Sequence, residues 1–179
     1  MRTTLVCVAA LLAACSAGSS AAPTTTSTNP SGSPGTNATI DRVVDGDTVD
    51  IQIDGTVERV RLIGIDTPET VKPDSPVECF GPEASAFTKA LVPEGAPVRL
   101  ERDVEARDDY GRLLAYVYLP GTDGSTGTDD DVFVNLEIVR QGYAALLTFP
   151  PNVAHVDEFV EAARAAEEAD LGLWAACGG

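Results

Sequence analysis

Acidic side chains occupy two chain turns that follow predicted strands. Asp47 closes the corner Asp45-Gly46-Asp47, and Asp66 and Glu69 flank the rigid turn Thr67-Pro68. Three carboxylates at one point repel one another unless a positive charge lies between them. Carboxylate and carbonyl oxygens are hard ligands that suit Ca²⁺ or Mg²⁺ rather than zinc. An acidic turn is most often only solvated, but the three carboxylates together make a candidate cation site.

Two arginines are candidate contacts for an anionic group. Arg61 lies among apolar residues of a predicted strand, and Arg112 follows the tight corner Tyr110-Gly111. A planar guanidinium can bind two oxygens of a phosphate at once. A divalent cation and two arginines together would neutralise a phosphate and the charge that develops on it during a reaction.

The elements that must position these residues are strands followed by helices. Alternating apolar and polar residues over 49–53, with many β-branched residues, predict strands. The start Gly81-Pro82-Glu83 predicts a helix. This order indicates an α+β, mainly β fold, a five-stranded OB-fold barrel with three helices, although the pattern alone also permits another α+β sheet. The expected strands are Thr39–Asp45, Thr48–Ile53, Val57–Ile65, Val98–Val104 and Arg112–Leu119, and the two later helices are Asn135–Gly142 and Val153–Ala169, the last with Asn152 as its N-cap.

The motifs taken in order carry a resemblance to a known family. The stretches are Asp45-Gly46-Asp47-Thr48, Arg61-Leu62-Ile63-Gly64-Ile65-Asp66-Thr67-Pro68-Glu69-Thr70, Gly81-Pro82-Glu83-Ala84-Ser85, Asp108-Asp109-Tyr110-Gly111-Arg112, and Asn135-Leu136 before Val139-Arg140-Gln141-Gly142. With these motifs, whose combination is highly specific, the chain resembles the staphylococcal nuclease (thermonuclease) family from about Ala38 to Trp174.

The resemblance implies a five-stranded OB-fold barrel with three helices and a calcium-dependent nuclease. Such an enzyme hydrolyses phosphodiester bonds of DNA and RNA by metal-assisted attack of water and leaves 3′-phosphates. In this sequence Asp47 and Asp66 resemble the side-chain calcium ligands, and Thr67 resembles the backbone-carbonyl ligand. Asp45 and Glu78 would be acids of the outer shell around the metal.

The same resemblance assigns the catalytic residues. Glu69 resembles the residue that orients or deprotonates the attacking water, while Arg61 and Arg112 resemble the pair that grips the phosphate. Tyr110 and Phe149 are candidate substrate contacts, because an aromatic ring can stack against a base.

Two stretches depart from the family pattern. Asp109 stands where the best-known member has a lysine that helps bind a terminal phosphate, so we expect that contact to be weaker here. The segment Thr148-Phe149-Pro150-Pro151 replaces a stretch with nucleotide-contacting tyrosines, which affects the base side of the site and not the catalytic residues.

The N-terminal residues predict export. Residues 1–14 have a positive start and a short apolar run, as in a signal peptide, and Leu12-Ala13-Ala14-Cys15 resembles a lipobox. We expect lipid on Cys15, a flexible Ser/Thr/Pro linker over 15–37, and the nuclease-like domain over 38–179. The protein would then be a cell-surface lipoprotein anchored to the membrane. The alternative is an ordinary secretory signal, which would release a secreted protein.

Two cysteines remain after the signal and the lipid site are set aside. Cys79 and Cys177 are an even pair in an oxidising location, which predicts a disulfide between them. Two separate buried thiols are the alternative.

The charge of the chain limits how it can hold nucleic acid. Asp+Glu number 28 against 12 Lys+Arg, a formal net charge of −16. The sequence therefore lacks the excess of basic residues that is usual in nucleic-acid binders. We expect weak affinity for the substrate, with a shallow dependence on salt concentration. We also expect the protein to be a monomer. The rival hypotheses are an OB module that binds nucleic acid or protein without cutting, and a calcium-stabilised surface adhesin.

Overall fold

The computed structural model describes residues 38–71, 76–122 and 124–178. The predicted signal peptide (1–14), the lipid site Cys15 and the linker (15–37) lie outside the described residues. Within the described ranges no helix is long and apolar enough to cross a membrane.

Five strands close into a barrel, which confirms the predicted OB-type α+β fold. They are β1 (Ala38–Asp45), β2 (Thr48–Ile53), β3 (Thr56–Leu62), β5 (Pro97–Glu101) and β6 (Leu113–Leu119). β1 pairs antiparallel with β2 and β5, β2 pairs with β3, and β5 pairs with β6. A parallel pairing of β3 with β6, from Val60 opposite Leu113 to Leu62 opposite Ala115, closes the ring.

Three short strands lie outside the five-stranded ring. β7 (Val132–Phe133) pairs antiparallel with β6, while β4 (Gly64–Asp66) and β8 (Ala145–Leu147) pair with each other in a separate sheet. The prediction of a single strand over Val57–Ile65 was therefore wrong, because β3 ends at Leu62 and β4 begins at Gly64. Gly64 has φ +86°, and a Cβ at this position would lie 2.5 Å from the Phe159 ring. Only glycine fits that close, left-handed corner.

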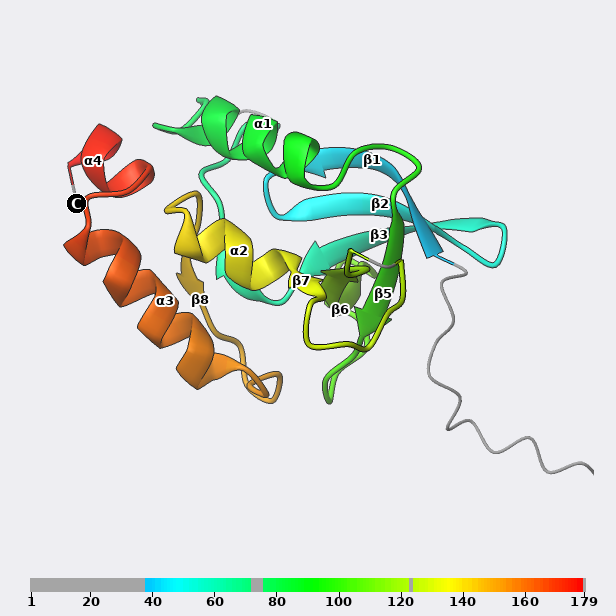
Figure 1. Cartoon of the computed structure of the whole chain (residues 1–179). Coiled ribbons are helices and arrows are strands. Elements are labelled where there is room, and N and C mark those ends of the chain that lie inside the picture. The colour runs from blue at the N-terminus through cyan, green and yellow to red at the C-terminus, as the bar shows by residue number, and fades with distance from the viewer. Residues whose placement is uncertain (1–37, 72–75, 123, 179) are drawn as a thin grey trace, which may run out of the picture. The chain divides into compact units, whose positions relative to one another are not determined.

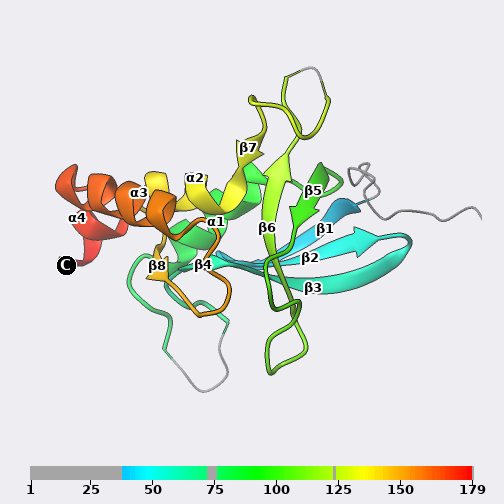
Figure 2. The ribbon, with the colours of Figure 1, turned by 90° about the horizontal axis from the view of Figure 1, so that it is seen from below.

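The helices are α1 (Gly81–Leu91), α2 (Val134–Arg140), α3 (Val156–Glu168) and α4 (Leu173–Cys177), so the structure adds a short fourth helix to the three expected. α3 begins at Val156 and not at Val153. Asn152 does not cap this helix, because its side-chain amide bonds to the backbone of Glu105. Figures 1 and 2 both place α3 and α4 at one end of the domain and the β2–β3 turn at the other.

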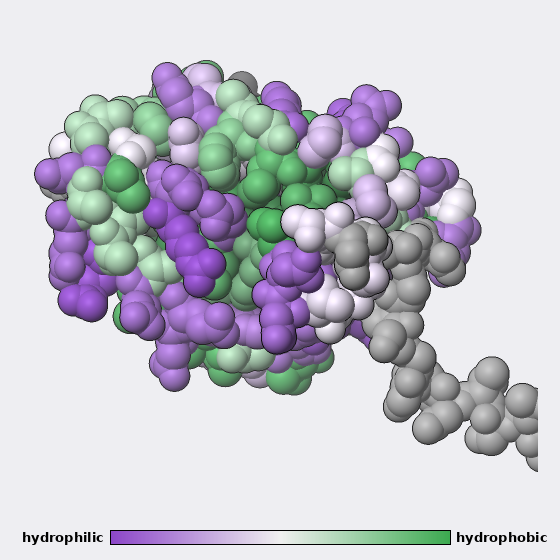
Figure 3. Space-filling model, viewed as in Figure 1, coloured by the Kyte–Doolittle hydropathy of each residue, from purple (hydrophilic) through white to green (hydrophobic). Residues whose placement is uncertain are grey.

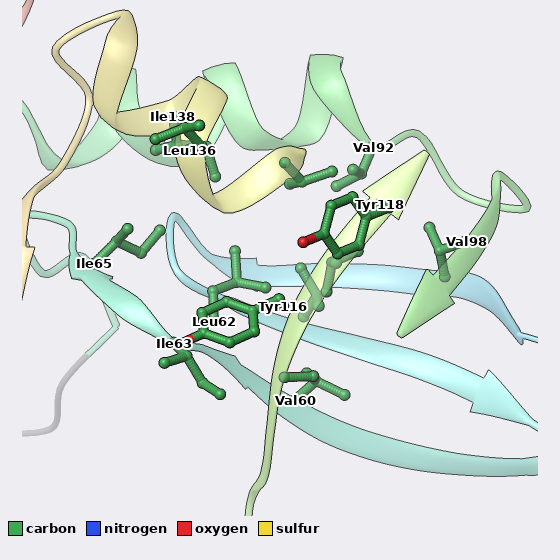
Figure 4. Packing of buried hydrophobic residues seen from close by; sticks show 14 of the residues in the cluster. Val60, Leu62, Ile63, Ile65, Val92, Val98, Tyr116, Tyr118, Leu136 and Ile138 are labelled. Carbon is green, nitrogen blue, oxygen red and sulfur yellow. The ribbon is translucent and has the colours of Figure 1, made fainter. Parts of the chain in front are cut away.

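The core lies between α2 and the inner faces of the barrel strands. Figure 4 shows Leu136 and Ile138 of α2 facing side chains such as Leu62 and Tyr116 of the strands. All four are buried. Asn135 joins the same two layers, since its amide is completely buried and bonds to three backbone groups of the barrel side.

Cys79 and Cys177 form a disulfide, with a sequence separation of 98, as the cysteine count predicted. The bond ties the residues just before α1 to the end of α4.

Hydrophilic side chains gather over α3 at the lower left of Figure 3. The exposed acidic residues of this helix are Asp157, Glu158, Glu161, Glu167 and Glu168.

Candidate active site

Arg61 joins the carboxylates of Asp47 and Asp66. Its Nη2 lies 2.9 Å from Asp66 Oδ1 and 3.2 Å from Asp47 Oδ2. Its Nη1 donates to the backbone carbonyls of Leu62 and Ile65, at 2.9 and 2.8 Å. Four acceptors on one planar group fix its direction, and the Arg61 side chain is only 12% exposed. We call Asp47, Arg61 and Asp66 the aspartate–arginine cluster.

The strand pairing explains why these residues meet. Thr48, at the start of β2, lies opposite Arg61 of β3, so the turn that carries Asp47 adjoins the arginine. Asp47 is buried, and its Oδ2 accepts hydrogen bonds from the Thr67 N–H at 3.0 Å and the Thr67 hydroxyl at 3.2 Å. A Cβ at Gly46 would lie 2.6 Å from Thr67 Oγ1. The turn after β4 therefore packs directly on the β1–β2 turn.

Glu69 belongs to a second acidic group with Asp45 and Glu78. Its Oε1 accepts hydrogen bonds from the N–H groups of Thr70 and Val71, at 3.0 and 2.8 Å. The Thr70 hydroxyl donates to buried Asp45 at 2.6 Å. Glu78 Oε2 accepts from the Glu69 N–H at 3.0 Å, so Glu78 holds the backbone that carries Glu69.

The charges of these groups perturb two carboxyls. A hydrogen bond shared with Asp45, together with burial, raises the pKa of Glu69 above its ordinary value. Burial raises the pKa of Asp66, Arg61 opposes that rise, and the neighbouring charges of Asp47 and Glu78 add to it. The carboxylates of Asp47, Asp66 and Glu78 therefore repel one another, although Arg61 offsets part of this repulsion.

The oxygen donors suit a hard cation. The Asp66 side chain is 57% exposed, Asp47 lies near it because Arg61 Nη2 contacts both carboxylates, and Thr67 follows Asp66 in the chain with its N–H on Asp47. Carboxylate and carbonyl oxygens are the ligand types that Ca²⁺ takes. Within the described part of the chain, however, no three His, Cys, Asp or Glu side chains converge as a metal-binding group. Arg61 lies between the two aspartates, and Glu69 bonds to the backbone of Thr70 and Val71.

A cavity of about 490 Å³ adjoins the aspartate–arginine cluster and shares Arg61 with it. Arg112, Tyr110 and Phe149 also line it, so the structure brings both predicted arginines and both candidate substrate contacts to one cavity. Its charged lining residues are Arg61, Arg107, Arg112, Glu105, Asp108 and Asp109. These three basic and three acidic groups cancel formally, in contrast to the −16 of the whole chain.

Asp108 directs Arg112. The Arg112 Nε donates to Asp108 Oδ2 at 2.6 Å, and the Arg112 backbone N–H donates to Asp108 Oδ1 at 2.9 Å. The Arg112 guanidinium carbon lies 5.5 Å from the centroid of the Tyr110 ring. Since the contact to Asp108 uses Nε, it leaves the two Nη groups of Arg112 for an oxyanion.

Two aromatic rings border the cavity and are exposed to solvent. Tyr110 is 86% exposed and Phe149 is 69% exposed. The wall that carries Phe149 is fixed by Asn152, whose Oδ1 accepts from the Glu105 N–H at 2.8 Å and whose Nδ2 donates to the Glu105 carbonyl at 3.1 Å. In Figures 1 and 2 the loop after β8 lies beside the segment between β5 and β6. Exposed rings on a fixed wall can stack on planar groups.

Three further residues shape the cavity without having been predicted from the sequence. Asp108 directs Arg112, Asn152 fixes the loop with Phe149, and Arg107 lines the cavity and pairs with Glu58. Asp108 belongs to the motif Asp108-Asp109-Tyr110-Gly111-Arg112, so its position four residues before Arg112 could have indicated the contact between the two side chains. Asn152 and Arg107 act on residues 47 and 49 positions away, which no local pattern indicates.

Comparison with known proteins shows the family of this chain. The family described as "Staphylococcal nuclease homologue" matches residues 59–176. The thermonuclease of Staphylococcus intermedius is 44% identical over 135 residues, covering 75% of this chain and 74% of that protein. The endonuclease YncB of Bacillus subtilis (strain 168) is 37% identical over 144 residues, covering 79% of this chain and 63% of that protein. This chain belongs to the staphylococcal nuclease family.

Proposed function

We propose that this protein is a calcium-dependent nuclease that hydrolyses phosphodiester bonds of DNA and RNA and leaves 3′-phosphates. Its family membership and the relatives named thermonuclease and endonuclease support nuclease activity on nucleic acids. The observation that carries the proposal is the position of Arg61, which contacts both aspartates and also lines the cavity with Arg112.

The reacting phosphodiester would lie at the cavity between the two arginines. Arg112 would donate to its non-bridging oxygens through Nη, and Arg61 through Nε because its two Nη groups already contact four acceptors. Both would stabilise the charge that builds up as water attacks phosphorus. Asp108 keeps Arg112 directed, and the carbonyls of Leu62 and Ile65 keep Arg61 directed. Fixed donors of this kind need no reorganisation during the reaction.

Glu69 would accept the proton of the attacking water. A bond forms between the water oxygen and phosphorus, and the bond from phosphorus to the 5′ oxygen breaks, leaving a 3′-phosphate and a 5′-hydroxyl. The 5′ oxygen leaves with the bonding electrons and takes up a proton. Asp45, Thr70 and Glu78 hold the Glu69 segment for this role through the hydrogen bonds described above.

Calcium would be held by Asp47, Asp66 and the carbonyl of Thr67, with Asp45 and Glu78 as outer acids. When bound, it would supply positive charge beside the phosphate and acidify or position water. The hard oxygen donors support this assignment over a thiophilic metal.

Digestion of plasmid DNA, single-stranded DNA and RNA tests the proposal. We expect cleavage with calcium and none with EGTA, and the products should be dephosphorylated at their 3′ ends by a 3′-phosphatase. Products with 5′-phosphates and 3′-hydroxyls would contradict the proposed direction of cleavage. Binding of the polymers without cleavage would favour a non-catalytic OB module.

We also propose that the protein is exported and anchored to the membrane through lipid on Cys15, and that it is a monomer. The support is the sequence of residues 1–15, with its apolar run and lipobox-like end. Metabolic labelling with a radioactive fatty acid should mark the wild type and not the Cys15→Ala variant. Label in neither protein, with the nuclease found in the medium, would indicate an ordinary secretory signal. Light scattering of the purified protein measures its mass in solution and so tests whether it is a monomer.

A further inference from the structure

An ion pair links the two segments that carry Arg61 and Arg112. Glu58 lies on β3, three residues before Arg61, and Arg107 precedes the Asp108–Arg112 turn. Arg107 Nη1 lies 2.9 Å from Glu58 Oε2, and Arg107 Nη2 lies 3.0 Å from Glu58 Oε1. The contact is therefore bidentate, which is the geometry that fixes a guanidinium best. We call Glu58 and Arg107 the brace pair.

Arg107 also holds the peptide group that leads into Arg112. Its Nη1 donates to the Gly111 carbonyl at 2.8 Å. On the other side of the same peptide bond, the Arg112 N–H donates to Asp108 at 2.9 Å. Because a peptide group is planar, these two bonds together fix its orientation. That orientation sets the direction in which the Arg112 side chain leaves the backbone.

The brace pair has little to contribute to stability. The Arg107 and Glu58 side chains are 47% and 31% exposed, and exposed ion pairs rarely stabilise a fold by much. The Arg107 hydrogen bond lowers the pKa of Glu58 below its ordinary value. Arg107 lines the cavity, but its two Nη groups bond to Glu58 and to the Gly111 carbonyl.

We propose that Glu58 and Arg107 are positioning residues, which hold the Gly111–Arg112 peptide so that Arg112 and Arg61 grip the same phosphate. The inference rests on the proposed nuclease function, in which both arginines contact the reacting group. Neither brace residue touches the substrate in this account. Their effect on the reaction passes through Arg112.

Glu58→Gln, made in the wild type and in an Arg112→Lys background, tests the route of action. A misplacement of about 1 Å can cost up to about 100-fold in rate, so we expect Glu58→Gln to lower kcat/KM on a short oligonucleotide by roughly 10- to 100-fold. In the Arg112→Lys background the further loss should be less than about twofold, since coupled residues are not additive. Arg107→Lys keeps the charge but not the fork, and should behave like Glu58→Gln.

Glu168→Gln is the matched control. It removes an exposed ion pair of similar length, Arg164 Nη1 to Glu168 Oε1 at 2.9 Å on α3, away from the cavity. This variant should keep the wild-type kcat/KM. Thermal unfolding of every variant checks that none has lost its fold. Unchanged kcat/KM in Glu58→Gln, or an equal loss in both backgrounds, would overturn the proposal.

A readout that needs no activity separates this inference from the proposed function. In ¹⁵N NMR spectra the Arg112 Nε–H, which bonds to Asp108 at 2.6 Å, should exchange faster with water in Glu58→Gln than in wild type. If the wild type fails to cleave but this exchange rises, the nuclease proposal is wrong and the brace pair stands. If the wild type cleaves and the Arg112 Nε–H is unchanged in Glu58→Gln, the brace pair is wrong.

Discussion

Replacing Asn135 with alanine should destabilise the protein far more than its single lost side chain suggests. The completely buried amide accepts from the Val117 N–H at 2.9 Å and donates to the carbonyls of Ile63 at 2.9 Å and Ala115 at 3.2 Å. Ala115 keeps a second bond, because the Ile63 N–H also donates to it at 3.1 Å. The Val117 N–H and the Ile63 carbonyl both lose the partner that Asn135 provides.

The magnitude follows from these two groups. A buried polar group left without its partner costs about 1–3 kcal/mol, so Asn135→Ala should lower the free energy of unfolding by about 2–6 kcal/mol. Whole domains are stable by only about 5–15 kcal/mol, so this is a large share of the total.

Urea unfolding, followed by Trp174 fluorescence and circular dichroism, measures the effect. The control is Gln141→Ala, which removes an exposed hydrogen bond of 2.8 Å from Gln141 to Glu137 at the end of the same helix. We expect that control to change stability by less than about 0.5 kcal/mol. A loss below about 1 kcal/mol for Asn135→Ala would refute the reasoning, because buried groups without partners cost at least that much.

Three further predictions concern the disulfide, the outer barrel face and the cavity. The double variant Cys79→Ser/Cys177→Ser should lose about 4–5 kcal/mol of unfolding free energy under the chain-entropy account, since the closed loop spans 98 positions; equal urea midpoints with and without a reducing agent in the wild type would contradict this. Asp50 is buried between Arg59, at 2.8 Å, and Arg42, at 2.7 Å. The hydrogen bond from Arg59 lowers the pKa of Asp50 despite burial, so its stabilisation is full above its ordinary pKa of 3.8 and is lost as the pH falls through its lower folded value. In Asp50→Asn the free energy of unfolding should therefore fall less steeply as the pH drops below 3.8. An unchanged dependence of stability on pH would contradict a stabilising contact of Asp50 with the two arginines. Phe149→Ala should weaken oligonucleotide binding by about 1–3 kcal/mol, the range for one stacked base, measured by fluorescence anisotropy; unaltered affinity would show that the exposed ring does not contact the base.

The order of strands and turns was predictable because its signals are local, whereas the closed barrel was implied by the family resemblance, since the pattern alone also permitted another α+β sheet. The turn with Asp47 and the strand with Arg61 follow from alternation and turn residues, and the pairing of Thr48 with Arg61 then brings them together. The break after Leu62 was missed, because apolar residues on both sides of Gly64 continue the strand pattern while packing against Phe159 decides the corner.

Long-range side-chain contacts explain the other misses. Asn152 has the residue type and position of an N-cap, but its amide pairs with Glu105, 47 residues earlier. Glu58 and Arg107 look like solvated charges until the fold brings them within 3.0 Å. The backbone N–H groups of Thr70 and Val71 also hold the Glu69 carboxylate, a contact that no residue pattern indicated.

Single-turnover cleavage by the wild type and the Glu69→Gln variant tests the central claim most directly. Glutamine keeps an oxygen that can accept from Thr70 and Val71, so the segment should stay in place while the proton acceptor is lost. With saturating calcium we predict that the cleavage rate of Glu69→Gln is lower than that of wild type by about 10²- to 10⁴-fold, which is the usual contribution of a general base. The variant should bind the oligonucleotide as tightly as wild type. EGTA should stop the wild type. A Glu69→Gln variant that cleaves at nearly the wild-type rate, or a wild type equally active in EGTA, would contradict the account.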